Sequence, residues 1–232
     1  MANLRVVGAG DSISWYQGGW RIFTANIANW VLMALIFGVI AMVLSFIPFI
    51  GMIALYLLLP LFLGGMFYSA QKLDQGQASD IMDIFSLFKD QQRLTPLIIL
   101  GLIMLGVGFV SMVVVGGMMF ASVSSSITPG AEMPMMPSIG FGGFLLALIV
   151  MILSGMLFLF ATPLVVFQNM SAIDAIKNSF TACVKNFPAF IIFMLIYALL
   201  AVIAVIPFGL GLLVLVPVFI AATYIGYKRI FA

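Results

Sequence analysis

The charged residues of the sequence divide it into three long tracts that carry almost no charge. The tracts are 50, 80 and 42 residues long, and Glu132 is the one charge inside them. They lie between Arg21 and Lys72, between Arg93 and Asp174, and between Lys185 and Lys228. A helix needs roughly 20 apolar residues to cross ~30 Å of hydrocarbon, so each tract has room for two membrane spans. The pattern therefore predicts six spans, over residues 30–47, 49–69, 97–121, 141–167, 189–206 and 210–227.

Each outward-going span follows a short stretch with the periodicity of an amphipathic helix. Residues 79–96 and 171–188 align without a gap, and their apolar residues recur at i, i+3 and i+7, on one helix face. These residues are Ile81, Ile84 and Phe88 in the one stretch and Ile173, Ile176 and Phe180 in the other. Near the N-terminus Ile13, Tyr16, Trp20, Phe23 and Ile27 continue this spacing with aromatics, which favours a helix in the headgroup layer.

These patterns predict an all-α fold, a polytopic membrane helical bundle. Six transmembrane helices form three hairpins, and a cytoplasmic interfacial amphipathic helix precedes each hairpin. The turn at 47–51 (IPFIG) also resembles that at 206–209 (IPFG). We therefore predict one transmembrane domain, 1–232, with three repeats, 12–69, 79–167 and 171–229, around an axis along the membrane normal. Because apolar sequences align easily by chance, the alternative is a similarity without symmetry.

The returning span of each predicted hairpin contains a proline. These prolines are Pro60, Pro163 and Pro217. Each removes one backbone hydrogen bond and can open carbonyl groups toward a cavity, which makes them candidate kink or cavity-lining residues. The alternative is a packing kink that a neighbouring helix compensates. Gly65 and Ser69, and likewise Ala222 and Gly226, follow two of the prolines at a small-xxx-small spacing that allows close helix approach.

The composition excludes several classes of protein. Hydrophobic residues make up 65% of the chain and charged residues 7%, which is too few for a water-facing surface. There is no histidine, so the commonest general base and metal ligand is missing, and we predict no enzyme, no catalytic residue and no cofactor. Cys183 is the single cysteine, which excludes an internal disulfide. The net charge of +2 is too small for nucleic-acid binding.

The basic residues predict the orientation in the membrane. With six spans, both termini lie on one side together with segments 70–96 and 168–188. All nine basic residues fall there: Arg5, Arg21, Lys72, Lys89, Arg93, Lys177, Lys185, Lys228 and Arg229. By the positive-inside rule the N- and C-termini are cytoplasmic. Residues 1–10 have no apolar signal region, so the first span is expected to serve as an uncleaved anchor.

Four of these cations are candidate contacts for anionic lipid headgroups. They are Lys89, Arg93, Lys177 and Lys185, on the stretches 79–96 and 171–188. Lys89 and Arg93 are at i and i+4, and acids precede the bases on both stretches, so complementing a helix dipole is the alternative role. Ser171-x-x-Asp174 has the spacing of a capping box, which assigns Asp174 to helix initiation.

The outward loop 122–140 contains the one metal-like group of residues in the sequence. The thioethers of Met133, Met135 and Met136 would suit a soft ion such as Cu(I). Three prolines and the absence of helical spacing favour instead a loop folded onto the bilayer surface, and we predict no metal site.

Two parts of the sequence resemble known membrane proteins. The last third contains Pro163, Phe167, the run SAIDAIKNS at 171–179 and the run YIGYKR at 224–229. This pattern resembles uncharacterised bacterial inner-membrane proteins, and the membrane domain of some glycerophosphodiester phosphodiesterases. The opening GGWRIF at 18–23, followed by Trp30, resembles one proteobacterial branch of such proteins. The resemblance implies a multi-pass fold in a bacterial inner membrane, and it transfers no site.

Two hypotheses of function follow. The first is a non-catalytic accessory or scaffold protein that binds membrane lipids, another membrane protein or a second copy of itself. Its motivation is the lack of catalytic groups together with three interfacial helices and short loops. The alternative is a passive facilitator or transporter of a lipid or a hydrophobic or neutral small solute along the predicted threefold axis, motivated by the proline and glycine content of the returning spans.

Overall fold

The computed structural model describes residues 4–126 and 141–231, which form nine α-helices and one 3-10 helix. The helices are α1 (Asp11–Ala25), α2 (Ile27–Ser45), α3 (Ile50–Asp74), η1 (Ile81–Phe88), α4 (Gln91–Ser126), α5 (Phe141–Phe158), α6 (Ala161–Gln168), α7 (Ala172–Lys185), α8 (Phe187–Val205) and α9 (Leu212–Phe231). The described part of the chain contains no strand, which confirms the all-α prediction.

Six helical segments are long and apolar enough to cross a membrane, as the sequence predicted. They are α2, α3, residues 91–118 of α4, α5 with α6, α8 and α9, and their mean hydropathy is 1.5 to 2.8. With 19 to 28 residues each, all can cover the hydrocarbon core. The chain is therefore a multi-pass membrane protein by the length and hydropathy of its helices.

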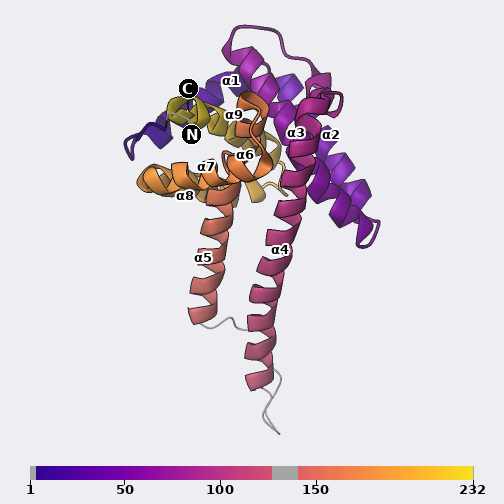
Figure 1. Ribbon diagram of the computed structural model, residues 1–232, viewed down its shortest axis with the longest axis vertical. Coiled ribbons are helices and arrows are strands. Elements are labelled where there is room, and N and C mark those ends of the chain that lie inside the picture. Colours follow the sequence, from indigo (N-terminus) through magenta and orange to yellow (C-terminus); the bar gives the residue numbers. More distant parts are fainter. Residues whose placement is uncertain (1–3, 127–140, 232) are drawn as a thin grey trace.

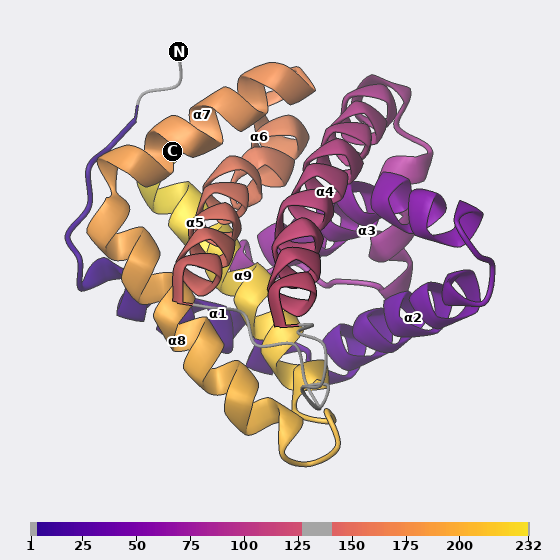
Figure 2. The same ribbon diagram turned by 90° about the horizontal axis from the view of Figure 1, so that it is seen from below.

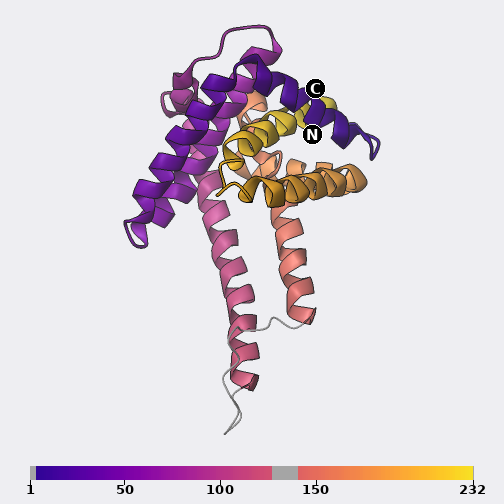
Figure 3. The same cartoon turned by 180° about the vertical axis from the view of Figure 1, so that it is seen from behind.

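The three hairpins diverge from a common hub. Helices α4 and α5 run side by side away from it, while α2 with α3 and α8 with α9 point in two other directions (Figure 1), (Figure 2). We define the hub as α1, η1, α6, α7 and the C-terminal halves of α3 and α9. Both ends of the described chain lie at the hub (Figure 3), as an even number of spans requires. The threefold repeat itself remains a prediction.

Each short helix packs on a returning span. In two cases it is the span that directly precedes the helix, since η1 packs on α3, and α7 packs on α5 and α6. Helix α1 packs instead on α9, the C-terminal helix of the described residues. The N-terminal helix therefore closes a ring with the C-terminal helix.

Glycines allow these helices to approach closely. A Cβ atom at Gly65 would lie 2.5 Å from the carbonyl oxygens of Asp83 and Ile84 in η1. A Cβ atom at Gly19 would lie 2.6 Å from the backbone nitrogen of Ala222 in α9. Two of the small residues that the sequence singled out, Gly65 and Ala222, therefore lie where short helices cross returning spans.

Helix α1 buries a face that coincides only in part with the apolar stripe seen in the sequence. Trp15 and, from the stripe, Phe23 are buried, whereas Ile13 and Trp20 of the stripe are each 53% exposed. Helix α7 is similar, because its small residues are buried while Ile173 is 57% exposed. Ile13, Trp20 and Ile173 therefore point away from the protein, which suits contact with lipid.

The amphipathic helix predicted over 79–96 is interrupted, and this corrects the sequence prediction. The 3-10 helix η1 ends at residue 88, and α4 begins at residue 91. The Asp90 carboxylate accepts hydrogen bonds from the backbone N–H groups of Gln92 (3.1 Å) and Arg93 (3.3 Å). These bonds satisfy free donors at a helix start, so a new helix begins here. Lys89 and Arg93, expected on one helix, consequently lie on the two sides of the break.

The span predicted over 141–167 is also broken, at residues 159–160. Pro163 has no N–H, and a proline ring clashes with the carbonyl four residues earlier, which ends α5. The side chain of Ser179 in α7 fills the break. The Phe160 N–H donates to Ser179 Oγ (3.1 Å), and that hydroxyl donates to the Met156 carbonyl (2.9 Å).

Replacing Ser179 with alanine should destabilise the protein by about 1–2 kcal/mol, because a buried N–H and a buried carbonyl lose their partner. Cys183 is buried, so its reaction with a maleimide dye during heating in detergent reports unfolding. Thr181→Ala is the control, since Thr181 is exposed and donates to the Lys177 carbonyl within α7. Equal unfolding midpoints for the two variants would contradict the role of Ser179.

Candidate functional site

Several charged side chains in and around the hub form ion pairs, most of them between separate elements. The Asp74 and Asp83 carboxylates are nearly buried, at 7% and 8% exposure. Asp74 in α3 pairs with side chains from α1 and α9, and Asp83 in η1 pairs with one from α3. The pairs among the described residues are Lys72–Asp83 (2.7 Å), Arg21–Asp74 (3.3 Å), Lys228–Asp74 and Arg93–Asp90.

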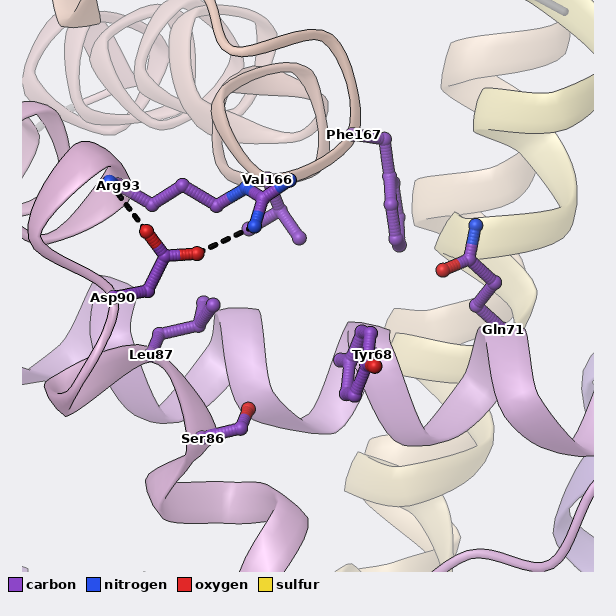
Figure 4. A pocket seen from close by; sticks show the side chains of 8 residues that line it. All are labelled: Tyr68, Gln71, Ser86, Leu87, Asp90, Arg93, Val166 and Phe167. Carbon is purple, nitrogen blue, oxygen red and sulfur yellow. Dashed lines mark hydrogen bonds and ion pairs between the residues drawn. The ribbon is translucent and has the colours of Figure 1, made fainter.

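A polar pocket lies at the break between η1 and α4, and we call it the Arg93 pocket. Its volume is about 300 Å³. The lining residues come from α3, η1, α4, α6 and the η1–α4 connection (Figure 4). They are Tyr68, Gln71, Ser86, Leu87, Asp90, Arg93, Val166 and Phe167. Figure 4 shows the Arg93 side chain along one wall, with Tyr68, Gln71 and Phe167 across the cavity.

Asp90 and Arg93 form the charged wall of this pocket. One guanidinium nitrogen, Nη1, donates to Asp90 Oδ2. Burial raises the pKa of the Asp90 carboxyl, but the hydrogen bonds from Arg93 and Gln92 and the charge of Arg93 together lower it by more, so the pKa lies below its ordinary value. The stabilisation from this pair is therefore fully present above the unfolded-state pKa, and it is lost as the pH falls through the lowered pKa. The pair is ionised at neutral pH.

Two other polar atoms of the pocket are buried without a partner. Arg93 Nε and Ser86 Oγ make no hydrogen bond with any residue that the structure describes. A buried donor without a partner costs about 1–3 kcal/mol, so it calls for an explanation such as a bound ligand. The arrangement can supply hydrogen bonds to a ligand that is rich in acceptor atoms.

The four predicted headgroup contacts do not form one surface. Arg93 lines its own pocket, and Lys89 is exposed at the break beside it. Lys177 and Lys185 share a different groove of about 510 Å³ along α7. Asp174 also lines this groove, and its backbone N–H donates to Ser171 Oγ (3.2 Å), so the predicted helix start is correct.

A basic groove lies at the junction of α1, α3 and α9, and the sequence analysis did not predict it. Its volume is about 490 Å³, and Arg21, Lys228 and Arg229 line it together with Asp74. The three cations face one carboxylate, which leaves the groove with a positive charge. These residues are far apart in the sequence, so their meeting depends on the ring that α1 closes with α9.

Apolar clefts open between the hairpins. One of about 210 Å³ lies between α2, α3 and α9, and Gly38, Phe62 and Leu213 are among its lining residues. Another of about 410 Å³ lies between α5, α7 and α8, with Met156, Phe180 and Phe187. Both are lined almost entirely by apolar side chains. Such clefts suit acyl chains or apolar helix surfaces.

The three singled-out prolines are buried where the returning spans enter the hub. Pro60 and Pro217 lie inside the continuous helices α3 and α9, whereas Pro163 follows the break before α6. None of them is among the residues that line the pockets and clefts described above. The methionines of the copper hypothesis, Met133, Met135 and Met136, lie outside the described residues.

Sequence reasoning found Arg93 but missed its partners in the pocket. Tyr68 lies at the end of the span predicted over 49–69 and Gln71 just beyond it, and Ser86 lies within the stretch predicted to be one amphipathic helix. A usable signal was Asp90, since an aspartate directly before a run of helix-forming residues is a helix-start signal. Reading it would have predicted the break, though not which side chains meet there.

Comparisons with models of protein families, with curated proteins and with solved structures gave no match. They identify no family for this chain, so the resemblance to bacterial inner-membrane proteins stays a prediction.

Proposed function

We propose that this chain is a non-catalytic accessory or scaffold protein of the bacterial inner membrane. It binds membrane lipids, or another membrane protein, along the apolar sides of its hairpins, with the hub and both termini in the cytoplasm. It needs no cofactor and binds no nucleic acid. The observation that carries this proposal is the position of the two apolar clefts, which open between neighbouring hairpins where these leave the hub.

The packing of the hub argues for binding over conduction. The ring of Phe167 in α6 lies 5.7 Å from that of Tyr224 and 5.4 Å from that of Tyr227, both in α9. Gln168 Nε2 also donates to the Tyr227 hydroxyl (3.2 Å). Aromatic side chains therefore occupy the space between two returning spans. A solute path through the hub would have to displace them.

The outer helices support contact with lipid or with a partner helix. Within their apolar windows α2 and α4 are 11% buried, whereas α9 is 67% buried. The three hairpins point in different directions from the hub (Figure 2), and large apolar side chains on α2, α4 and α8 are exposed. In a membrane such surfaces contact acyl chains or the helices of another protein.

Replacing Gly38 with leucine should fill the cleft between α2, α3 and α9 without harming the fold. A Cβ atom at Gly38 meets nothing within 4 Å, and leucine favours a helix more than glycine does. Native mass spectrometry of protein extracted in mild detergent should then show about one phospholipid fewer per chain, because the side chain occupies space that an acyl chain would fill.

The matched control is Gly106→Leu, because a Cβ atom at Gly106 also meets nothing within 4 Å and Gly106 does not line this cleft. If both variants retain the wild-type number of lipids, and if crosslinking in native membranes captures no protein, the proposal fails. Solute or lipid flux through proteoliposomes that exceeds the flux through protein-free liposomes would favour the facilitator instead.

A further inference from the structure

We infer that the Arg93 pocket binds a phosphoryl oxyanion, namely the phosphodiester of a phospholipid headgroup. The inference rests on the proposed lipid-binding function and names the headgroup chemistry and the residues that recognise it. The same chemistry could be supplied by free phosphate from solution, and the experiment below separates the two sources.

The unused donors of the pocket define the ligand. The Nη1 atom of Arg93 donates a hydrogen bond to Asp90. The opposite edge of the guanidinium carries Nε–H and Nη2, and Nε has no hydrogen-bond partner among the described residues. These two N–H groups form a planar fork that matches two oxygens of a phosphate or carboxylate. The Ser86 hydroxyl lines the same cavity and is also buried without a partner among the described residues. A ligand with two or three acceptor oxygens would satisfy both.

The charges of the pocket favour a single negative charge on that ligand. Arg93 is already paired with Asp90, so the two side chains together carry no net charge. A dianionic phosphate costs more to desolvate than a monoanionic phosphodiester, and an ion pair without net charge does not offset the difference. A phosphodiester therefore fits better than free phosphate.

The size and walls of the pocket agree with a headgroup. A volume of about 300 Å³ is at the low end for small-molecule sites, which suits a phosphate with a short polar substituent. Leu87 and Val166 lie on the Arg93 side of the cavity, and Phe167 lies across it beside Gln71 and Tyr68 (Figure 4). A glycerol backbone can lie on the Phe167 ring while the phosphoryl oxygens face Arg93.

The experiment titrates the full-length protein in detergent with three probes. They are dihexanoyl phosphatidylglycerol, dihexanoyl glycerol, which lacks the phosphate, and inorganic phosphate. The readout is the temperature at which Cys183 becomes reactive. Phosphatidylglycerol should raise this temperature, dihexanoyl glycerol should not, and inorganic phosphate should act more weakly.

Variants assign the binding to this pocket. Arg93→Lys keeps the charge but loses the fork, so half-maximal protection should need about tenfold more phosphatidylglycerol. Ser86→Ala should also weaken binding severalfold, although without ligand its unfolding temperature should equal or exceed that of the wild type, because the hydroxyl it removes has no partner. Arg21→Lys, in the basic groove, is the matched control and should bind like the wild type.

Three outcomes would count against the inference. Protection by phosphatidylglycerol that is equal in the wild type, Arg93→Lys and Ser86→Ala would overturn the pocket assignment and leave lipid binding intact. Protection by inorganic phosphate alone, lost in the same two variants, would overturn the lipid source. If the wild type gains no protection from any probe and retains no phospholipid, the pocket and the proposed function both fail.

Discussion

Replacing Gly19 with valine should release α1 from α9 and destabilise the protein by about 3–5 kcal/mol, above the usual cost of overpacking. A Cβ atom at Gly19 would lie 2.6 to 2.8 Å from Ala222 N, Ala222 Cα and Val218 O. All three are backbone atoms, so no side-chain rotation can relieve the contact. The helices must separate, and Trp15 and Phe23 would then lose their burial.

Cys183 thiol reactivity during heating measures this loss, and the matched control is Gly106→Val. A Cβ atom at Gly106 meets nothing within 4 Å, so valine there should change stability by less than about 0.5 kcal/mol. Of the milder variants, Gly19→Ala should lower the stability and Gly106→Ala should raise it, because alanine stabilises a helix wherever it has room. Unchanged stability of Gly19→Val would show that α1 does not need its close approach to α9.

The second large effect on stability is expected at the ion pair between Asp83 of η1 and Lys72 of α3. Replacing Asp83 with alanine should cost about 3 kcal/mol, the low end for breaking a buried ion pair. Lys72 Nζ lies 2.7 Å from Asp83 Oδ1, and the side chains are 24% and 8% exposed, so some water reaches the lysine and moderates the loss. The variant also loses the hydrogen bond that the Asp80 N–H donates to Asp83 Oδ2 (3.0 Å).

A double variant separates the ion pair from other contributions. In Lys72→Met with Asp83→Ala no buried charge is left unpaired, so much of the lost stability should return. The same Cys183 assay measures Lys72→Met, Asp83→Ala and the double variant against the wild type. If the double variant is as unstable as the sum of the two single ones, the ion pair does not explain the loss.

The sequence predicted the six spans well because their causes are local. A membrane helix satisfies its backbone hydrogen bonds within its own segment, and about 20 apolar residues suffice to cross the hydrocarbon. The predicted boundaries therefore agree with α2, α3, α8 and α9 to within a few residues. The start of α7 was also predictable from the local sequence, because Ser171 caps a helix that begins one residue later.

The two breaks show where local reasoning stopped. The sequence marked Pro163 as a kink, but the break at 159–160 also depends on Ser179, which reaches in from another helix. The break before α4 depends on Asp90, which satisfies the new helix start. Both were read as continuous helices, because apolar periodicity records which residues avoid water and not where the backbone hydrogen bonds change partners.

By itself, the sequence determined that this is a helical protein of the membrane, with apolar spans and short amphipathic helices between them. The tertiary structure alone decided which face α1 buries, that α1 closes a ring with α9, and that Ser86, Arg93 and Phe167 share one cavity. Hydrophobic length acts within a single segment, so it can be read along the chain. A pocket is made of side chains from separate helices, and their meeting depends on glycine crossings and ion pairs that no single segment contains.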